Sequence, residues 1–423
     1  MTPLSGPKSV SDHLRATLEP VLGAPVHIDA LQRLSGGASR ETWSFSAAGR
    51  DLILRRDPPG RPGVGGSMRT EADAMRACTR AGLLVPEVLV DDDGSLLGTA
   101  GLVMARVPGE TLARRILRDE DFARARTVLV DDLGAFLAGL HAVDPAEVPG
   151  AVEVDSLTQY WNAYGMVEDR SATFEKAYDW LMENRPPRTA TTLVHGDLRL
   201  GNIIVGPDGL AAAIDWELVH VGDPLEDLGW LCVKAWRFGA PLEVGGLGTI
   251  DQLVRAYEAA GGRTVDRDAL HWWLVAKTLQ WGVGCMGQAA AHLTGAVRSV
   301  ELAAIGRRVA EQEWDLIELL APDEWKAARD APPAPSVPDV ADVNGRPTAR
   351  ELLDAVRGFL LDDVVPATSG RVSFHARVAA NAIAIVERQL AQDSHAPSGD
   401  DWGSLALTVR DKLAVANPKH LSR

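Results

Sequence analysis

The sequence predicts an α+β protein that combines a small β-rich N-terminal lobe, a larger helical lobe and a small all-α C-terminal domain. Short apolar runs in residues 1–110 suit strands, whereas residues 111–330 mostly show helical spacing. A Pro-rich linker at 331–346 separates these lobes from renewed helical spacing in residues 347–423. A chain of 423 residues also exceeds the roughly 250–300 residues at which single cores stop growing, so two or three domains are expected.

Composition narrows the class of protein. The 58 acidic side chains outnumber the 43 basic ones, and the formal charge of −15 argues against binding to duplex nucleic acid, which needs a basic surface. No apolar run reaches the roughly 18 residues of a membrane span, and the first residues lack the apolar core of a signal peptide. Cys78, Cys232 and Cys285 have neither metal-site nor disulfide spacing. We therefore expect a cytoplasmic protein with no membrane contact.

In the first hundred residues we expect strands and one helix. Four Gly and three Pro in Asp57–Gly66 exclude regular structure there. Alternating apolar residues predict a strand around Thr42–Phe45, behind a Ser/Gly-rich turn, and three more strands and a helix follow from the same periodicities. These further strands are Leu52–Arg56, Leu83–Val90 and Leu102–Val107, and the helix is Thr70–Ala81.

The C-terminal segment begins a new pattern after the linker, whose first eight residues include four prolines. Thr348 and Glu351 have the spacing of a capping box, which predicts the start of a helix with one apolar face. Further helices are expected at Arg371–Gln392 and Leu405–Ala416. The apolar residues are Leu352, Leu353, Val356, Phe359 and Leu360 in the first helix and, on the buried side of the second, Phe374, Val378, Ala382 and Ile385. No catalytic set is present, so we expect this domain to serve in docking or homo-oligomerisation.

The residues that indicate chemistry lie in Thr192–Trp216, where strands and loops interrupt the helical pattern. Asp197 and Asn202 occupy a tight loop, and two short strands joined by a turn then lead to Asp215. Such a β-hairpin would bring these three side chains to one end. Two carboxylates and an amide oxygen are hard ligands that suit Mg²⁺. One Asp could then orient a hydroxyl nucleophile while the other residues hold the metal, as phosphoryl transfer requires.

The pattern His-x-Asp-x4-Asn, followed by Ile-Asp-Trp, resembles the aminoglycoside phosphotransferase family, and the resemblance covers residues 28–328. It implies the bilobal protein-kinase-like fold, ATP or GTP as phosphate donor, Mg²⁺ as cofactor and a small-molecule hydroxyl acceptor. Asp197 would accept the acceptor's proton, and Asn202 and Asp215 would bind Mg²⁺. His195 would support the catalytic loop, and Arg199 would help to hold the transferring phosphate.

The resemblance also assigns residues of the N-terminal lobe. The family's nucleotide-covering loop corresponds to Ser35, Gly36, Gly37, Ala38 and Ser39, and no Walker A motif is present. Where the family has a Lys on the third strand, this chain has Arg55 followed by Arg56, and only one of them can face the phosphates because strand side chains alternate. Arg55 matches best, with Glu71 as its ion-pair partner. Backbone groups near Ala105 and Val107 would contact adenine at the hinge between the lobes.

Other positions are expected to be architectural. His141 ends a helix at a family-typical place and should be a packed structural residue, and Asp223 should cap the helix that contains Asp227. Most of the twelve Trp residues should belong to the core. Trp272, Trp273 and Trp281 are left open between core and acceptor pocket, because His271–His292 would pack near the catalytic loop.

The sequence does not identify the small molecule that would accept the phosphate. His271–His292 contains no Asp or Glu, which counts against a polycationic antibiotic, and Arg298 and Gly306–Arg308 add positive charge. The chain also resembles the phosphotransferase branch related to domains fused to acyl-CoA dehydrogenases, which implies a hydroxyacyl-CoA-type acceptor. The alternatives are a nucleotide-binding regulatory module without transfer activity, favoured by the change from Lys to Arg, and an aminoglycoside or macrolide antibiotic kinase.

Overall fold

The computed structural model describes residues 7–34, 40–58, 66–188, 190–339, 345–392 and 399–422. The chain divides into two compact units: the first comprises residues 1–154 and 187–270, and the second comprises residues 155–186 and 271–423. The lobe and domain boundaries expected from the sequence stay a prediction. Among the described residues, no helix combines the length and the apolar character that crossing a membrane requires.

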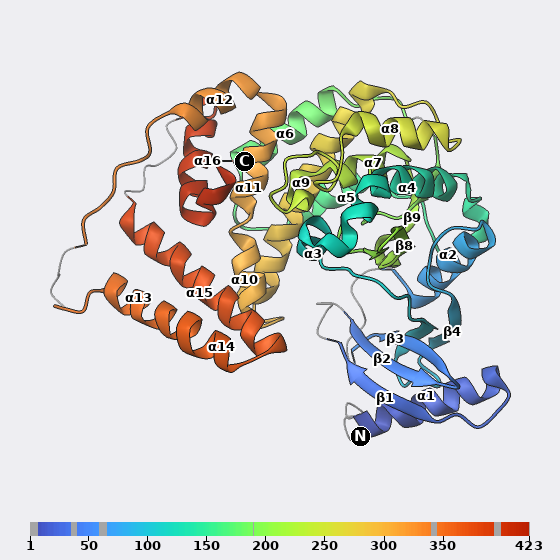
Figure 1. Ribbon diagram of the computed structural model, residues 1–423. Helices are drawn as coiled ribbons and strands as arrows, with labels where there is room; N and C mark the ends of the chain where they lie inside the picture. The colour runs from blue at the N-terminus through green and yellow to red at the C-terminus, as the bar shows by residue number, and fades with distance from the viewer. Residues whose placement is uncertain are drawn as a thin grey trace. The chain divides into compact units, whose positions relative to one another are not determined.

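An antiparallel five-stranded sheet forms the N-terminal part of the first unit (Figure 1). The spatial order of its strands is β1 (Ile28–Arg33), β2 (Glu41–Ala47), β3 (Arg50–Arg56), β5 (Ala100–Ala105) and β4 (Val88–Asp93). Strand alternation buries Leu52 and Leu54 of β3 in one core with Leu14 and Leu18 of α1 (Pro7–Leu22). The same alternation directs Arg55 to the opposite face of the sheet, where the predicted site lies.

The strand predicted at Leu83–Val90 is wrong in its position, because β4 begins only at Val88. Pro86 has no N–H to donate to a sheet, and Gly82 has a φ of 77° where the chain turns away from the preceding helix. That helix, α2 (Met68–Arg80), starts two residues before its predicted bound. The hydroxyl of Ser67 caps it by accepting the backbone N–H of Thr70 at 3.1 Å.

Two short sheets and a set of helices complete the first unit. β6 (Thr192–Val194) pairs with β9 (His220–Gly222), and β7 (Ile203–Gly206) pairs with β8 (Gly209–Ala213) in the predicted hairpin. The helices are α3 (Ala113–Arg118), α4 (Ala123–Ala142), α7 (Leu225–Cys232) and α8 (Ile250–Ala259). Gly134 allows α4 and α8 to pack closely, because a Cβ there would lie 2.7 Å from the Cβ of Ala256.

The second unit is helical. Its elements are α5 (Ser156–Tyr164), α6 (Ala172–Glu183), all but the first residues of α9 (Arg267–Leu293), α10 (Val300–Gly306), α11 (Val309–Leu320), α12 (Pro322–Asp330), α13 (Ala349–Phe359), α14 (Val365–Ala367), α15 (Gly370–Ala391) and α16 (Trp402–Ala416). Trp272 and Trp273 of α9, which the sequence left open between core and acceptor pocket, are buried. A cavity of about 660 Å³ opens beside α5 and α6, and its lining includes Trp161, Tyr164 and Arg170.

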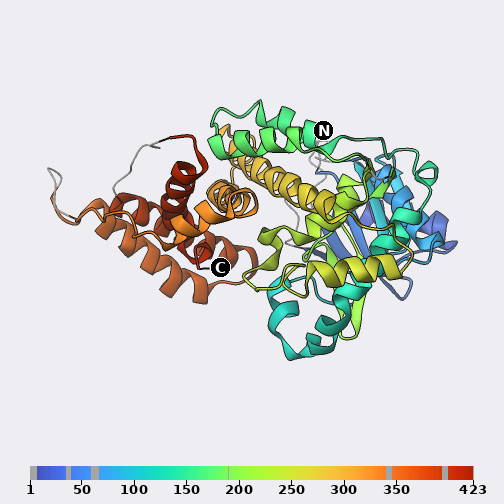
Figure 2. The ribbon, with the colours of Figure 1, turned by 90° about the horizontal axis from the view of Figure 1, so that it is seen from above.

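The C-terminal helices confirm their predicted positions but correct their predicted burial. The capping box of Thr348 and Glu351 is present, and α13 and α15 pack side by side (Figure 1 and Figure 2). Phe374, predicted on the buried side of α15, is 47% exposed, whereas Ile385 is buried. Periodicity shows which side chains share a helix face, but it does not show whether another element covers that face.

The last predicted helix, α16, joins a core with α11 and α12 rather than standing apart. Leu405, Val409 and Leu413 pack with Trp314 and Ile317. Buried polar pairs accompany this core: His420 contacts Asp315 at 2.7 Å, and Asn417 donates to Glu311 at 2.9 Å. Within the second unit, the end of the chain is therefore integrated with α11.

Candidate active site

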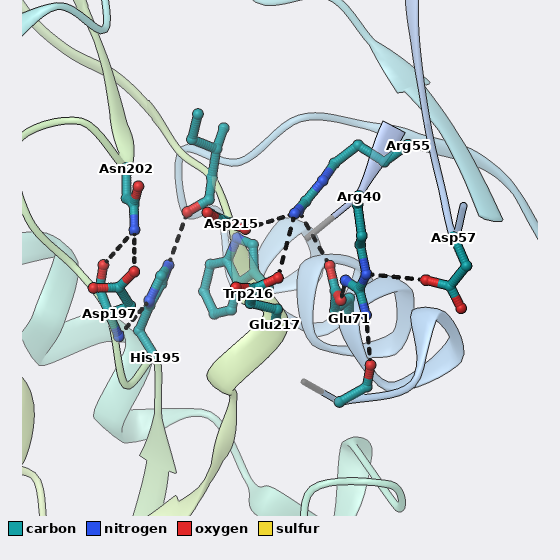
Figure 3. Close-up of polar contacts among 12 residues, drawn as sticks. Arg40, Arg55, Asp57, Glu71, His195, Asp197, Asn202, Asp215, Trp216 and Glu217 are labelled. Carbon is teal, nitrogen blue, oxygen red and sulfur yellow. Dashed lines mark hydrogen bonds and ion pairs between the residues drawn. The ribbon is translucent and has the colours of Figure 1, made fainter. Parts of the chain in front are cut away.

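The hairpin of β7 and β8 brings the three predicted metal and base residues together. Ile203 pairs with Ala213, and the next backbone bond runs from Ile214 N–H to the carbonyl of Asn202 at 2.9 Å. Asn202 and Asp215 therefore lie next to this end of the hairpin. The side-chain N–H2 of Asn202 donates to Asp197, at 2.5 Å to Oδ2 and at 2.9 Å to the backbone oxygen (Figure 3).

Both carboxylate oxygens of Asp197 accept hydrogen bonds. Arg199 Nε and Trp230 Nε1 donate to Oδ1, at 3.0 and 2.8 Å, and Asn202 donates to Oδ2. Burial raises the pKa of Asp197, and the charge of Arg199 opposes that rise. The guanidinium of Arg199 in turn lies 4.5 Å from the ring centroid of Trp236. No motif marked Trp230 as a partner of the predicted base, because it lies 33 residues away in sequence.

His195 acts on the backbone of the loop. Its Nδ1 accepts the N–H of Asp197 at 3.2 Å, and its Nε2 lies 3.1 Å from the carbonyl of Ile214. The first partner can only donate and the second can only accept, so the ring is neutral with its proton on Nε2. Burial lowers the pKa of His195, which agrees with a neutral ring. His195 thus links the loop that carries Asp197 to the residue before Asp215.

Asp227 supports the same loop from α7. Its carboxylate accepts the backbone N–H groups of His195 and Gly196, each at 2.9 Å, and lies 3.3 Å from His141 Nε2. Burial acts to raise the pKa of Asp227, but the bonds from His141 and the loop outweigh it, so the pKa is lowered. His141 also contacts the hydroxyl of Tyr257 at 3.0 Å, which confirms its expected packed role. Asp223 accepts the backbone N–H of Leu225 at 2.9 Å, at the start of α7.

Arg55 is the arginine of β3 that faces the site. Its Nη1 donates to Glu71 at 3.2 Å and its Nη2 to Asp215 at 2.6 Å, while Nη2 lies 3.9 Å from Glu217. Arg56 points the other way and its Nε donates to Glu41 at 2.9 Å. The pair predicted between Arg55 and Glu71 is therefore formed, and of the two arginines it is Arg55 that points toward Asp215. Contact of Arg55 with the phosphates stays a prediction.

A second arginine, Arg40, also contacts Glu71, and the sequence analysis did not predict it. Arg40 Nη1 donates to Glu71, its Nε donates to Asp57 at 3.2 Å, and its Nη2 donates to the carbonyl of Gly66 at 2.7 Å. The only sequence signal is that Arg40 directly follows the predicted nucleotide loop. That loop, Ser35–Ser39, lies outside the described residues.

The hinge prediction is only partly compatible with the backbone. Ala105 donates its N–H to Glu87 at 2.9 Å, so that donor is already used. Val107 lies beyond the end of β5. Further along, Gly109 lets the chain approach the hairpin, because a Cβ there would lie 2.5 Å from Ile204 Cγ2. Contact of Ala105 or Val107 with adenine stays a prediction.

The oxygen donors of the site fit Mg²⁺. Asp215 offers a carboxylate and Asn202 an amide oxygen, and Mg²⁺ typically takes one or two protein carboxylates together with phosphates and water. Across the described residues, no three His, Cys, Asp or Glu side chains converge as metal ligands. Asp215 is held at φ 68° and ψ 60°, a left-handed conformation that non-glycine residues seldom adopt outside constrained sites.

Comparisons with known proteins agree with this geometry. Residues 30–273 match the family model described as the phosphotransferase enzyme family, and residues 366–400 match a domain of unknown function. Acyl-CoA dehydrogenase family member 10 of Mus musculus is 31% identical over 220 residues, which are 48% of this chain and 20% of that protein. Acyl-CoA dehydrogenase family member 11 of Gallus gallus is 26% identical over 332 residues, 69% of this chain and 41% of that protein. The chain thus matches less than half the length of these relatives.

A solved structure shares the fold. It is that of a Ralstonia eutropha protein assigned as an aminoglycoside phosphotransferase, with a TM-score of 0.55 and 22% identity, covering 69% of this chain and 92% of that chain. At this identity the likeness concerns the fold alone. The α+β, kinase-like fold predicted from the sequence is confirmed.

Proposed function

Because this chain belongs to the phosphotransferase enzyme family, we propose that it transfers the γ-phosphate of ATP or GTP to a hydroxyl group of a small molecule. The observation that supports this most strongly is the arrangement around Asp197. Its side chain is only 14% exposed and its carboxylate is oriented by Arg199, Trp230 and Asn202, and Asn202 lies beside Asp215 at the end of the hairpin. A base held in one orientation beside two hard oxygen ligands suits phosphoryl transfer to an alcohol.

Each group has a distinct task in this proposal. Asp197 accepts the proton of the acceptor hydroxyl while the hydroxyl oxygen forms a bond to the γ-phosphorus. The bond between this phosphorus and the nucleoside diphosphate breaks. Arg55 and Arg199 stabilise negative charge on the phosphates. Asn202 and Asp215 would hold Mg²⁺, which when bound neutralises phosphate charge. His195 and Asp227 hold the loop, so they are positioning residues.

Nucleotide binding gives the first test. We expect Mg-ATP or Mg-GTP to raise the thermal unfolding midpoint of the wild-type protein, because a ligand that binds only the native state stabilises it. In Asp215→Ala this rise should be lost or strongly reduced, since a proposed Mg²⁺ ligand is removed. Asp208→Ala is the matched control, because Asp208 lies in the turn of the same hairpin with its side chain 83% exposed. No shift of the wild type with either nucleotide would contradict the proposal.

For the acceptor, we propose a hydroxyacyl-CoA-type molecule, an inference supported by two relatives named as acyl-CoA dehydrogenase family members. The positive charge of Gly306–Arg308 is weaker evidence against a polycationic acceptor than the sequence suggested. Arg307 donates to Gln389 at 2.8 Å and Arg308 to Glu311 at 3.1 Å, so both arginines already have protein partners. The competing acceptor class is an antibiotic. The regulatory alternative has no geometric support from Arg55, which makes the pair with Glu71 that the family's Lys would make.

An acceptor panel separates these classes. Release of nucleoside diphosphate should be stimulated by hydroxyacyl-CoAs and not by sugars, aminoglycosides or macrolides. The same hydroxyacyl-CoA chains without the hydroxyl group are the control, because they can bind but cannot accept a phosphate. Stimulation by an antibiotic, together with reduced drug susceptibility of cells that express the protein, would instead support the antibiotic-kinase alternative.

A further inference from the structure

Glu71 is a buried carboxylate that contacts two arginines instead of one cation. Its side chain is 0% exposed, with Arg40 on Oε1 and Arg55 on Oε2 (Figure 3). A buried carboxylate needs a partner, because an uncompensated charge inside a protein is strongly destabilising. Since each arginine contacts a different oxygen, Arg40 can neutralise Glu71 without help from Arg55. Arg55 is therefore not required as the sole counter-charge of Glu71.

This matters because Arg55 also contacts Asp215, the proposed Mg²⁺ ligand, at 2.6 Å. An arginine that binds phosphate must give up at least one of its protein partners. If Arg55 were the sole partner of Glu71, the buried carboxylate would bind both terminal nitrogens of the Arg55 guanidinium in the bidentate geometry that an Arg–carboxylate pair prefers. With Arg40 on Glu71, Arg55 can release Asp215 and turn Nη2 to a phosphate oxygen while Nη1 stays on Glu71.

Arg40 also connects three segments around the site. Its Nε contacts Asp57 just after β3, and its Nη2 contacts the carbonyl of Gly66 just before α2. Gly66 in turn donates its N–H to the carbonyl of Glu217, two residues after Asp215, at 2.8 Å. The side chain of Arg40 is only 2% exposed, so these contacts are shielded from water. These contacts fix the positions of Glu71, Gly66 and the segment that carries Asp215 relative to one another.

We propose that Arg40 is a positioning residue for nucleotide binding, which neutralises Glu71 so that Arg55 can exchange Asp215 for a phosphate oxygen. This inference rests on the proposed phosphotransferase function. It assigns Arg40 a role through Arg55 and not through contact with the substrate. A purely structural arginine would affect the stability of the fold, whereas a positioning arginine should change how strongly the nucleotide binds.

The test compares Arg40→Gln, Arg40→Lys, Glu71→Gln and the double variant Arg40→Gln/Glu71→Gln by steady-state kinetics and thermal unfolding. We expect Arg40→Gln to raise the KM for Mg-nucleotide by about tenfold, a size typical of coupling between contacting groups, with a smaller loss in kcat. Adding Glu71→Gln should recover part of the lost affinity, because the buried carboxylate that captures Arg55 is gone. Arg33→Gln is the control, since Arg33 is a 57% exposed arginine of the same sheet.

Each outcome is decisive. Unchanged nucleotide KM in Arg40→Gln would overturn the inference, as would effects of Arg40→Gln and Glu71→Gln that simply add. Arg40→Lys keeps the charge that neutralises Glu71 and should stay near the wild-type KM. If Arg40→Gln does not fold, the double variant is compared with Glu71→Gln: an equal nucleotide KM supports the role, because no carboxylate is left to neutralise, and a further rise refutes it. Failure of the wild type to bind any Mg-nucleotide would refute the proposed function itself, which is a separate result.

Discussion

Replacing Asp197 with Asn is expected to slow phosphoryl transfer by roughly 10²–10⁴-fold, the usual contribution of a positioned general base. The shape of the side chain is kept, but the group that would accept the hydroxyl proton is lost. Arg55, Glu71 and Asp215 are unchanged, so Mg-nucleotide binding should stay close to that of the wild type. Single-turnover transfer, measured beside the nucleotide-induced thermal shift, separates the chemical step from binding.

The matched control for this variant is Asp208→Asn. Asp208 lies at the far turn of the hairpin that leads to Asp215, and it is exposed. The substitution Asp208→Asn makes the same chemical change away from the site, so the transfer rate of this variant should equal that of the wild type. If Asp197→Asn retained the wild-type rate while binding nucleotide normally, Asp197 could not be the base and the proposed mechanism would be wrong.

The sequence predicted those parts of the site that lie close together along the chain. Asp197, Asn202 and Asp215 belong to one loop and one hairpin, so spacing alone brings them near one another. Strand alternation likewise predicted that Arg55 and Arg56 face opposite ways. In each case the local geometry of a single element was enough to decide the arrangement.

The residues that were missed depend on packing between distant segments. Arg40 meets Glu71 across 31 residues, and Trp230 meets Asp197 across 33. No local sequence pattern predicts either contact, because both depend on how distant segments pack in the folded chain. The same reason explains the error at Phe374, where helical periodicity predicted a buried face that is exposed. It also explains why Asp227 was read only as part of a capped helix.

Asp227 should be the main determinant of the stability of the catalytic loop. Asp227→Ala leaves the buried backbone N–H groups of His195 and Gly196 without their acceptor, and each such group costs about 1–3 kcal/mol. We therefore expect the free energy of unfolding to fall by roughly 2–6 kcal/mol, with transfer activity lost because the loop that carries Asp197 is released. Denaturant unfolding followed by tryptophan fluorescence measures the first effect. Asp251→Ala is the control, because Asp251 is exposed in α8 of the same unit.

The pH dependence of Asp227→Asn tests the electrostatic part of this argument. The pKa of Asp227 is lowered in the folded protein, so its carboxylate adds stability that is fully present above its unfolded pKa of about 3.9 and is lost as the pH falls through the folded pKa. The difference in unfolding free energy between wild type and Asp227→Asn should thus be constant above about pH 5 and shrink below about pH 4. A difference that stayed the same throughout this acidic range would mean that Asp227 acts through hydrogen-bond geometry alone, without a contribution from its charge.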